Sequence, residues 1–251
     1  MTFILKSFAK EIFFEYKTRK EPSKAIIILP GFPSSNKEDE IINTLFEKGY
    51  NVFFMRYKGS FQSEGKFLEK DPTKDIKEFV NYLETGKTKN LWDETESLFK
   101  NTEYIILTGS FSGAIALGVN EDKIKKIILC SPVWDYTEHN KDGDEQEFTH
   151  LTRFVKKGWN NLYKYTFKDI QEQMKKFENC KWKNYKEQLK NKQILILHDP
   201  KDDTTSIKHT KKHLEEVPSI KLIEHELGHG TRIKIIRKYL ESILEFIEKK
   251  A

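Results

Sequence analysis

The chain has 251 residues, a length that suits one large α/β domain or a domain with an inserted segment. Charged residues make up 33% of it, and the net charge of +5 is spread without a basic block of the kind that nucleic-acid binding favours. No apolar run reaches the roughly 20 residues needed to span a bilayer, and Met1–Lys10 lacks the pattern of a signal peptide.

The two cysteines, Cys130 and Cys180, are too few for a disulfide framework, and neither has a partner at a metal-ligand spacing. We therefore expect a cytoplasmic protein without a cofactor, a metal site, a nucleic-acid partner or a membrane span. The oligomeric state is not predicted.

The first half of the chain alternates between short apolar runs and segments with helical spacing. Strands are expected at 2–8, 11–16, 25–29, 51–55, 104–107 and 124–130, and helices at 38–48, 74–83 and 114–119. Ala25–Leu29 is apolar at every position, which is typical of a strand covered on both faces. This alternation predicts an α/β fold with a mostly parallel central sheet and helices on both faces, and the leading strands could pair antiparallel at one edge.

The middle of the chain has a different pattern. Residues 137–192 hold no strand-like run, but three sets of apolar residues follow the helical period: Phe148, Leu151, Phe154 and Val155; Ile170, Met174 and Phe177; and Trp182, Tyr185 and Leu189. The alternation then resumes with strands at 194–197 and 220–223 and helices at 206–216 and 233–246. We expect residues 1–136 and 193–251 to form the α/β core, and residues 137–192 to form a helical cap inserted after the strand that ends at Cys130.

Four strand ends carry a glycine-rich turn, a serine, an acid and a histidine. They are Pro30-Gly31-Phe32-Pro33, Thr108-Gly109-Ser110-Phe111-Ser112-Gly113, His198-Asp199-Pro200-Lys201-Asp202 and Glu224-His225-Glu226-Leu227-Gly228-His229-Gly230. Ligands of such sheets bind outside the carboxyl ends of the strands. The order serine, aspartate, histidine along the chain is associated with the α/β-hydrolase fold.

With these motifs the sequence resembles the α/β hydrolases over nearly its whole length. The segment Tyr57-Lys58-Gly59-Ser60-Phe61-Gln62-Ser63-Glu64-Gly65 is similar to a loop of many esterase-like and serine-aminopeptidase-like members. The resemblance implies acyl transfer from a small-molecule acyl substrate through a serine nucleophile, and a lid over the site. The cleaved bond stays open among ester, thioester, amide and peptide, with esters of modest size favoured.

The chemistry of these residue types gives each a role. A serine hydroxyl is a poor nucleophile until an imidazole takes its proton, and a buried carboxylate fixes the tautomer of that imidazole. Ser110, His229 and Asp202 are the candidates for these three roles. The oxyanion hole would be formed by the backbone N–H groups of Phe32 and Phe111.

Two of these assignments have rivals. Thr108 and Ser112 replace the outer glycines of the Gly-x-Ser-x-Gly pattern, so Ser112 is a second candidate nucleophile beside Ser110. Asp203 is a second candidate for the acid beside Asp202, although we expect it to be an exposed neighbour. His209 and His213 lie four residues apart on a Lys-rich helix and could bind a metal, but a solvated helix face is favoured. The other histidines besides His229 are given no role in the chemistry.

Two other functions remain as alternatives. His225-Glu226-x-x-His229 matches the zinc-protease motif, which requires a helix and a third ligand. Gly228 and Gly230 oppose a helix there. A protein of this fold could also bind ligands without catalysis.

Overall fold

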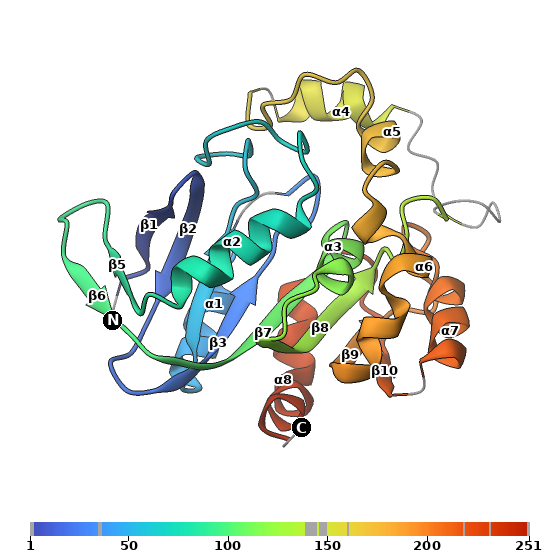
Figure 1. Cartoon of the computed structure of the whole chain (residues 1–251). Helices are drawn as coiled ribbons and strands as arrows, with labels where there is room; N and C mark the ends of the chain where they lie inside the picture. Colours follow the sequence, from blue (N-terminus) through green and yellow to red (C-terminus); the bar gives the residue numbers. More distant parts are fainter. Residues whose placement is uncertain are drawn as a thin grey trace.

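The computed structural model describes residues 3–34, 37–138, 145, 150–159, 161–217, 219–230 and 232–249. Its main sheet runs in the order β1-β2-β4-β3-β7-β8-β9-β10 (Figure 1). The strands are β1 (Leu5–Ala9), β2 (Ile12–Lys17), β3 (Ser23–Ile28), β4 (Asn51–Met55), β7 (Asn101–Ser110), β8 (Ile124–Pro132), β9 (Gln193–His198) and β10 (Ile220–Glu224). Within the described ranges, β2 pairs antiparallel with β1 and β4, and the pairs from β4 to β10 are parallel. The expected mostly parallel sheet with an antiparallel edge is confirmed.

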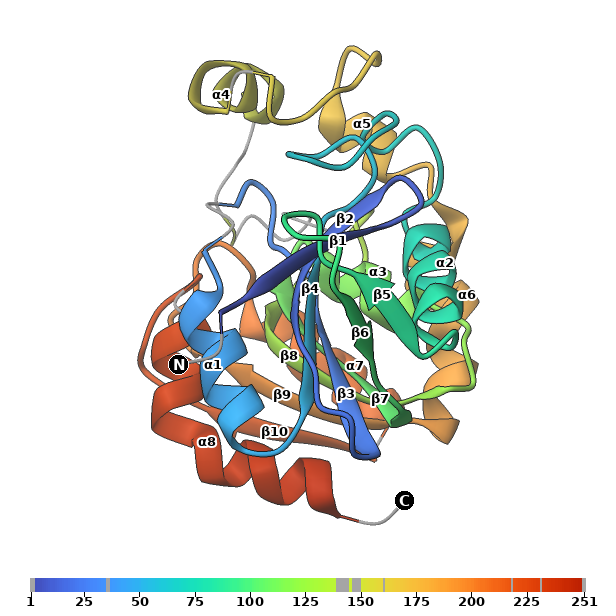
Figure 2. The same ribbon diagram turned by 90° about the vertical axis from the view of Figure 1, so that its left-hand side faces the viewer.

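Helices cover both faces of the sheet. Figure 2 shows α1 (Asp39–Glu47) and α8 (Arg232–Glu248) on one face, and α2 (Thr73–Leu83) and α3 (Ser112–Gly118) on the other. The helix α7 (Ile207–Glu216) connects β9 to β10. This arrangement explains the continuous apolar runs in the sequence, because a strand with helices on both faces has no polar side.

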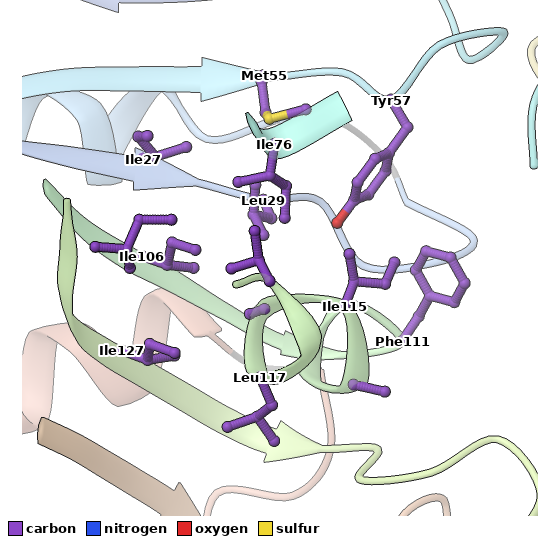
Figure 3. Packing of buried hydrophobic residues seen from close by; sticks show 14 of the residues in the cluster. Ile27, Leu29, Met55, Tyr57, Ile76, Ile106, Phe111, Ile115, Leu117 and Ile127 are labelled. Atoms are coloured by element: carbon purple, nitrogen blue, oxygen red, sulfur yellow. The ribbon is translucent and has the colours of Figure 1, made fainter. Parts of the chain in front are cut away.

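The strand β3 illustrates how the two layers of the core form. Ile26 and Ile28 are fully buried against α1 and α8, whereas Ile27 is fully buried in the cluster on the opposite face. In Figure 3, Ile76 of α2 and Ile115 of α3 belong to that second cluster. Burial of each such side chain contributes roughly 1.5–3 kcal/mol, so the two layers anchor the sheet whose ends carry the site.

A small hairpin of β5 (Lys87–Lys89) and β6 (Glu96–Leu98) was not expected from the sequence. Its strands are short and polar, so they lack a hydrophobic period that could reveal them. The hairpin region docks on the edge strand β1, where the Leu91 N–H donates to the Lys6 carbonyl over 2.8 Å. It therefore covers a strand edge that would otherwise be unpaired.

The described part of the segment between β8 and β9 contains short helices, as expected, joined by turns and by an isolated antiparallel bridge between Tyr163 and Ser60. It contains α4 (Leu151–Gly158), α5 (Ile170–Met174), α6 (Trp182–Tyr185) and 3₁₀ turns at Glu178–Cys180 and Lys186–Asn191. The expected helical residue Phe148 lies outside the described residues. The buried apolar residues of α5 and α6 belong to the same cluster as α2 and α3, so this part of the segment is packed onto the core. No helix of the described residues is both long and apolar enough to cross a bilayer.

Candidate active site

The turn between β7 and α3 holds Ser110 in a strained backbone conformation. The φ angle of Ser110 is 50°, in the left-handed region that costs a residue with a side chain roughly 1–2 kcal/mol. A Cβ atom at Gly109 would lie 2.0 Å from the carbonyl oxygen of Cys130, and one at Gly113 would lie 2.6 Å from Cβ of Pro132. Both glycines are therefore needed for the turn to lie against β8. Strain of this kind is found where function requires it.

The structure brings together the three side chains that the sequence singled out. The Nε2 atom of His229 lies 3.0 Å from Oγ of Ser110, and its Nδ1 atom lies 2.8 Å from Oδ2 of Asp202. The three residues come from the turn after β7, the loop after β9 and the loop after β10. A carboxylate only accepts hydrogen bonds, so the neutral imidazole carries its proton on Nδ1 and directs the Nε2 lone pair at the serine hydroxyl.

Asp202 is a buried carboxylate that is held in its charged form. Its Oδ1 atom accepts hydrogen bonds from the backbone N–H groups of Thr204 and Thr205, each over 3.0 Å. Burial opposes ionisation, but the hydrogen bond and the charge of His229, together with the Thr205 N–H, outweigh it and hold the pKa of Asp202 well below its usual range. Asp203 is exposed, as expected. Asp202 is thus the acid that contacts His229.

Ser112, the rival nucleophile, is fully buried. Its hydroxyl donates to the Pro30 carbonyl over 2.5 Å and accepts from the Tyr57 hydroxyl over 2.9 Å. Thr108 likewise donates to the Leu29 carbonyl over 3.2 Å. The two residues that replace the outer glycines of the motif therefore tie the serine turn to the loop after β3. His229 contacts the other serine of the turn, not this one.

The loop that carries His229 is positioned by Asp199, a buried residue to which the sequence analysis gave no role. Its Oδ2 atom accepts the Gly228 N–H over 2.6 Å, and its Oδ1 atom accepts the Lys201 N–H over 2.8 Å. Burial raises the pKa of Asp199, but these two N–H groups lower it more, so the net shift is downward. The sequence feature that could have identified Asp199 is its position directly after a buried strand. Gly228 and Gly230 have φ angles of 72° and 70°, which glycine adopts without strain.

The zinc-motif residues do not share a helix. His225 and Glu226 follow β10 in a turn, His225 is buried with Nδ1 accepting the Leu227 N–H, and Glu226 is exposed. Searched over the described residues, the structure contains no group of three or more His, Cys, Asp or Glu side chains arranged to hold a metal ion. The motif therefore lacks the shared helical face on which its two imidazoles would have to lie.

The expectation of a solvated face for His209 and His213 is wrong. The His209 side chain is only 12% exposed and lies beside Glu145. His213 is fully buried against the rings of Trp134 and Trp182, at centroid distances of 4.8 and 4.1 Å. Burial is the main cause that lowers its pKa to about 4, against the opposing effect of Glu138. The sequence did not predict this burial, because most other positions of α7 are polar and indicate an exposed helix.

Aromatic packing holds the loop after β3 against the serine turn. The Phe32 ring lies 5.2 Å from that of Phe111 and 4.9 Å from that of Tyr163, and the Tyr163 hydroxyl accepts the Ser34 N–H over 3.1 Å. No acceptor for the backbone N–H of Phe32 or Phe111 is found among the described residues. The two groups that the sequence suggested as oxyanion donors thus lie on neighbouring segments. Neither donates a hydrogen bond to another described residue.

A cavity of about 740 Å³ opens beside Ser110 and His229. Leu151 and Phe154 of α4 and Met174 of α5 also line it. Its volume falls in the range of roughly 300–1,000 Å³ that is typical of sites for small molecules. The lining is mixed, because Lys37, Glu38, Lys175 and Arg232 also contribute to it. The apolar residues of α4 and α5 could contact an apolar part of a substrate, and the charged residues a polar part.

The order of strands, the helices on both faces and the site at the strand ends together define the α/β-hydrolase fold. Several solved structures share the fold of the chain. An esterase of Pyrococcus furiosus has a TM-score of 0.68 at 17% identity, with 98% of this chain and 89% of that one covered. An esterase of Exiguobacterium antarcticum has a TM-score of 0.63 at 15% identity, with 99% and 100% covered.

A bromoperoxidase of Bacillus anthracis is also similar, with a TM-score of 0.62 at 15% identity over 98% of this chain and 100% of that one. No family model matches the sequence, and no curated protein is similar to it. Because the fold hosts more than one chemistry, the reaction has to be argued from the site.

Proposed function

We propose that this chain is a serine hydrolase that cleaves a carboxylic ester through an acyl-enzyme on Ser110. The observation that carries the proposal is the pair of hydrogen bonds, 3.0 and 2.8 Å long, that link Ser110 through His229 to the buried Asp202. The strained backbone of Ser110 supports the proposal, because such a turn exposes the serine hydroxyl at the carboxyl end of its strand. The likeness in fold to two esterases points to the same class of reaction.

In the first half of the reaction, Oγ of Ser110 attacks the substrate carbonyl carbon while Nε2 of His229 takes the hydroxyl proton. Asp202 stabilises the imidazolium that forms. The carbonyl oxygen becomes an oxyanion, which the backbone N–H groups of Phe32 and Phe111 bind. His229 then gives its proton to the leaving alcohol as the ester bond breaks.

In the second half, a water molecule replaces the alcohol. His229 takes a proton from this water as its oxygen attacks the acyl carbon. The tetrahedral intermediate collapses, the acid is released, and the proton on His229 returns to Ser110. The net change is one ester and one water converted to one acid and one alcohol.

The segment 137–192 acts in this proposal as a cap over the core formed by 1–136 and 193–251. The support is that Leu151, Phe154 and Met174 of this segment line the same cavity as Ser110. These apolar side chains favour an acyl ester whose acyl chain they can contact. We also keep the cytoplasm as the proposed location, since Cys130 and Cys180 are both unpaired and buried.

The test is labelling with a fluorophosphonate together with the hydrolysis of chromogenic esters of increasing chain length and of aminoacyl amides. Ser110→Ala is expected to abolish labelling and to lower turnover by roughly 10⁴- to 10⁶-fold, because the nucleophile is lost. Ser112→Ala is the matched control. It removes a buried hydroxyl from the same turn and should leave labelling intact, at a cost of about 1 kcal/mol in the free energy of unfolding.

Three results would contradict the proposal. Labelling that persists after Ser110→Ala would mean that another residue is the nucleophile. Activity that is lost with a chelator and restored by zinc would favour metal chemistry. A protein that reacts with neither the phosphonate nor any of the substrates would favour ligand binding without catalysis.

A further inference from the structure

Charge is unevenly distributed around the cavity mouth. Both signs alternate over most of the chain, but residues 150–168 contain five Lys and Arg residues and no Asp or Glu. On α4, Arg153, Lys156 and Lys157 are all exposed. They lie at the spacing that places them on one face of the helix. This run is therefore a cationic surface that its own sequence does not neutralise.

Within the described part of the structure, none of the three cations of α4 forms an ion pair with a carboxylate. Other surface lysines of the same segment do, as in the pairs Lys175–Glu172 and Lys190–Glu187. Exposed ion pairs of that kind contribute little to stability, but they neutralise the local field. Among the described residues, no carboxylate neutralises the positive charge of α4 in this way.

Large apolar side chains are exposed beside these cations. Phe154 of α4 is 55% exposed and Leu162, just beyond the helix, is 39% exposed. Phe154 also lines the cavity, as does Leu151 one turn earlier, so apolar side chains of α4 reach from the cavity to the exposed surface. An apolar rim next to unpaired cations matches an amphiphile with a negative head group better than a purely ionic polymer such as a nucleic acid.

The end of α4 is tied to the loop after β3, which packs against the serine turn. Nε1 of Trp159 donates to the Ser34 carbonyl over 2.9 Å, and the Trp159 ring lies 5.3 Å from that of Phe154. Both views of the molecule show α4 at the end opposite the carboxyl terminus, beyond the edges of the sheet (Figures 1 and 2). A flat surface could therefore reach α4 without meeting the core.

We propose that the outer face of α4, with Phe154 and Leu162, docks on an anionic lipid surface, and that the substrate is a water-insoluble acyl ester drawn from that surface into the cavity. The docking stands on the charge and the exposed apolar residues alone. The identity of the substrate also rests on the proposed function.

The test is cosedimentation with vesicles of phosphatidylcholine alone or with about 30% phosphatidylserine, at low and at high salt. The Ser110→Ala protein is used, so that binding is measured without turnover. Binding is expected to the anionic vesicles and to fall with salt. Arg153→Gln/Lys156→Gln/Lys157→Gln should weaken it roughly a hundredfold, because each cation near an acidic membrane contributes about fivefold.

The matched control is Lys234→Gln/Arg237→Gln/Lys238→Gln. It removes the same one Arg and two Lys from exposed positions of α8 and should leave binding within a few-fold. The proposal is overturned if the α4 variant binds like its parent, if the α8 control loses as much, if neutral vesicles bind equally well, or if single-stranded RNA competes fully for the same face. All the substituted side chains are exposed, and thermal unfolding would verify that the variants are folded.

A second arm uses the active protein with the same two sets of substitutions. The α4 variant should hydrolyse a soluble short-chain ester as fast as its parent but a vesicle-borne ester at least tenfold more slowly. Absence of hydrolysis in every protein, with binding unchanged, would refute the proposed function and leave the docking surface standing. Equal loss on both substrates would overturn the docking role.

Discussion

The two loops that meet at the candidate site are held by different forces. The serine turn after β7 is fixed by close packing, because Gly109 and Gly113 leave no room for a Cβ atom against β8. The histidine loop after β10 has open space around Gly228 and Gly230 and is held by the carboxylates of Asp199 and Asp202. Packing tolerates no added atom, whereas hydrogen bonds depend on the protonation and identity of a partner. Substitutions in the first loop should therefore affect stability most, and substitutions in the second should affect activity and pH response.

The largest expected effect is that of Gly109→Ala on stability. Its Cβ atom would lie 2.0 Å from the Cys130 carbonyl oxygen, a backbone atom that can yield only if β8 moves. We expect the free energy of unfolding to fall by about 3 kcal/mol or more, measured by denaturant titration.

Gly230→Ala in the other loop is the control. Its Cβ atom would meet nothing within 4 Å, so only the φ angle of 70° opposes the substitution, at roughly 1–2 kcal/mol. Equal losses at the two positions would refute the contrast between the loops.

Asp199→Ala should affect catalysis in the second loop. It leaves the Gly228 N–H without its acceptor and frees the loop that orients His229. We expect kcat/KM for an ester to fall about 10- to 100-fold, mainly through kcat. A misplaced base reduces the stabilisation of the transition state more than it reduces substrate binding.

Asp199→Asn keeps an acceptor oxygen at the same place and should restore most of the rate. A loss of the same size in both variants would mean that the negative charge, and not the hydrogen bond, is what matters. Unchanged rates in both would remove Asp199 from its positioning role.

The smallest expected effect is a dependence of stability on pH. The pKa of Asp202 is lower in the folded chain than in the unfolded one, so its contribution to stability is complete well above pH ~4 and is lost as the pH falls toward the folded value. The free energy of unfolding of the parent should therefore fall by about 1 kcal/mol more than that of Asp202→Asn between pH ~6 and pH ~3. Urea titrations across this range would measure the difference, and parallel curves for the two proteins would contradict it.

Much of the fold could be predicted because apolar periodicity is local. Ala25–Leu29 identified a strand covered on both faces, and the helices followed from their spacing. The hairpin of β5 and β6 could not be predicted, since its strands hold few apolar residues and depend on docking against β1. The burial of His213 was also missed, because it depends on Trp134 and Trp182, which lie far away in the sequence.

The candidate site divides in the same way. The sequence by itself determined which side chains follow which strands, because residue type and strand position can both be read along the chain. Only the tertiary structure decided which serine and which aspartate contact His229, and whether the histidine motif lies on a helix or in a turn. These choices depend on distances between segments up to 119 residues apart. Such distances are set by how the strands line up in the sheet and how tightly the turns pack, and no local pattern encodes them.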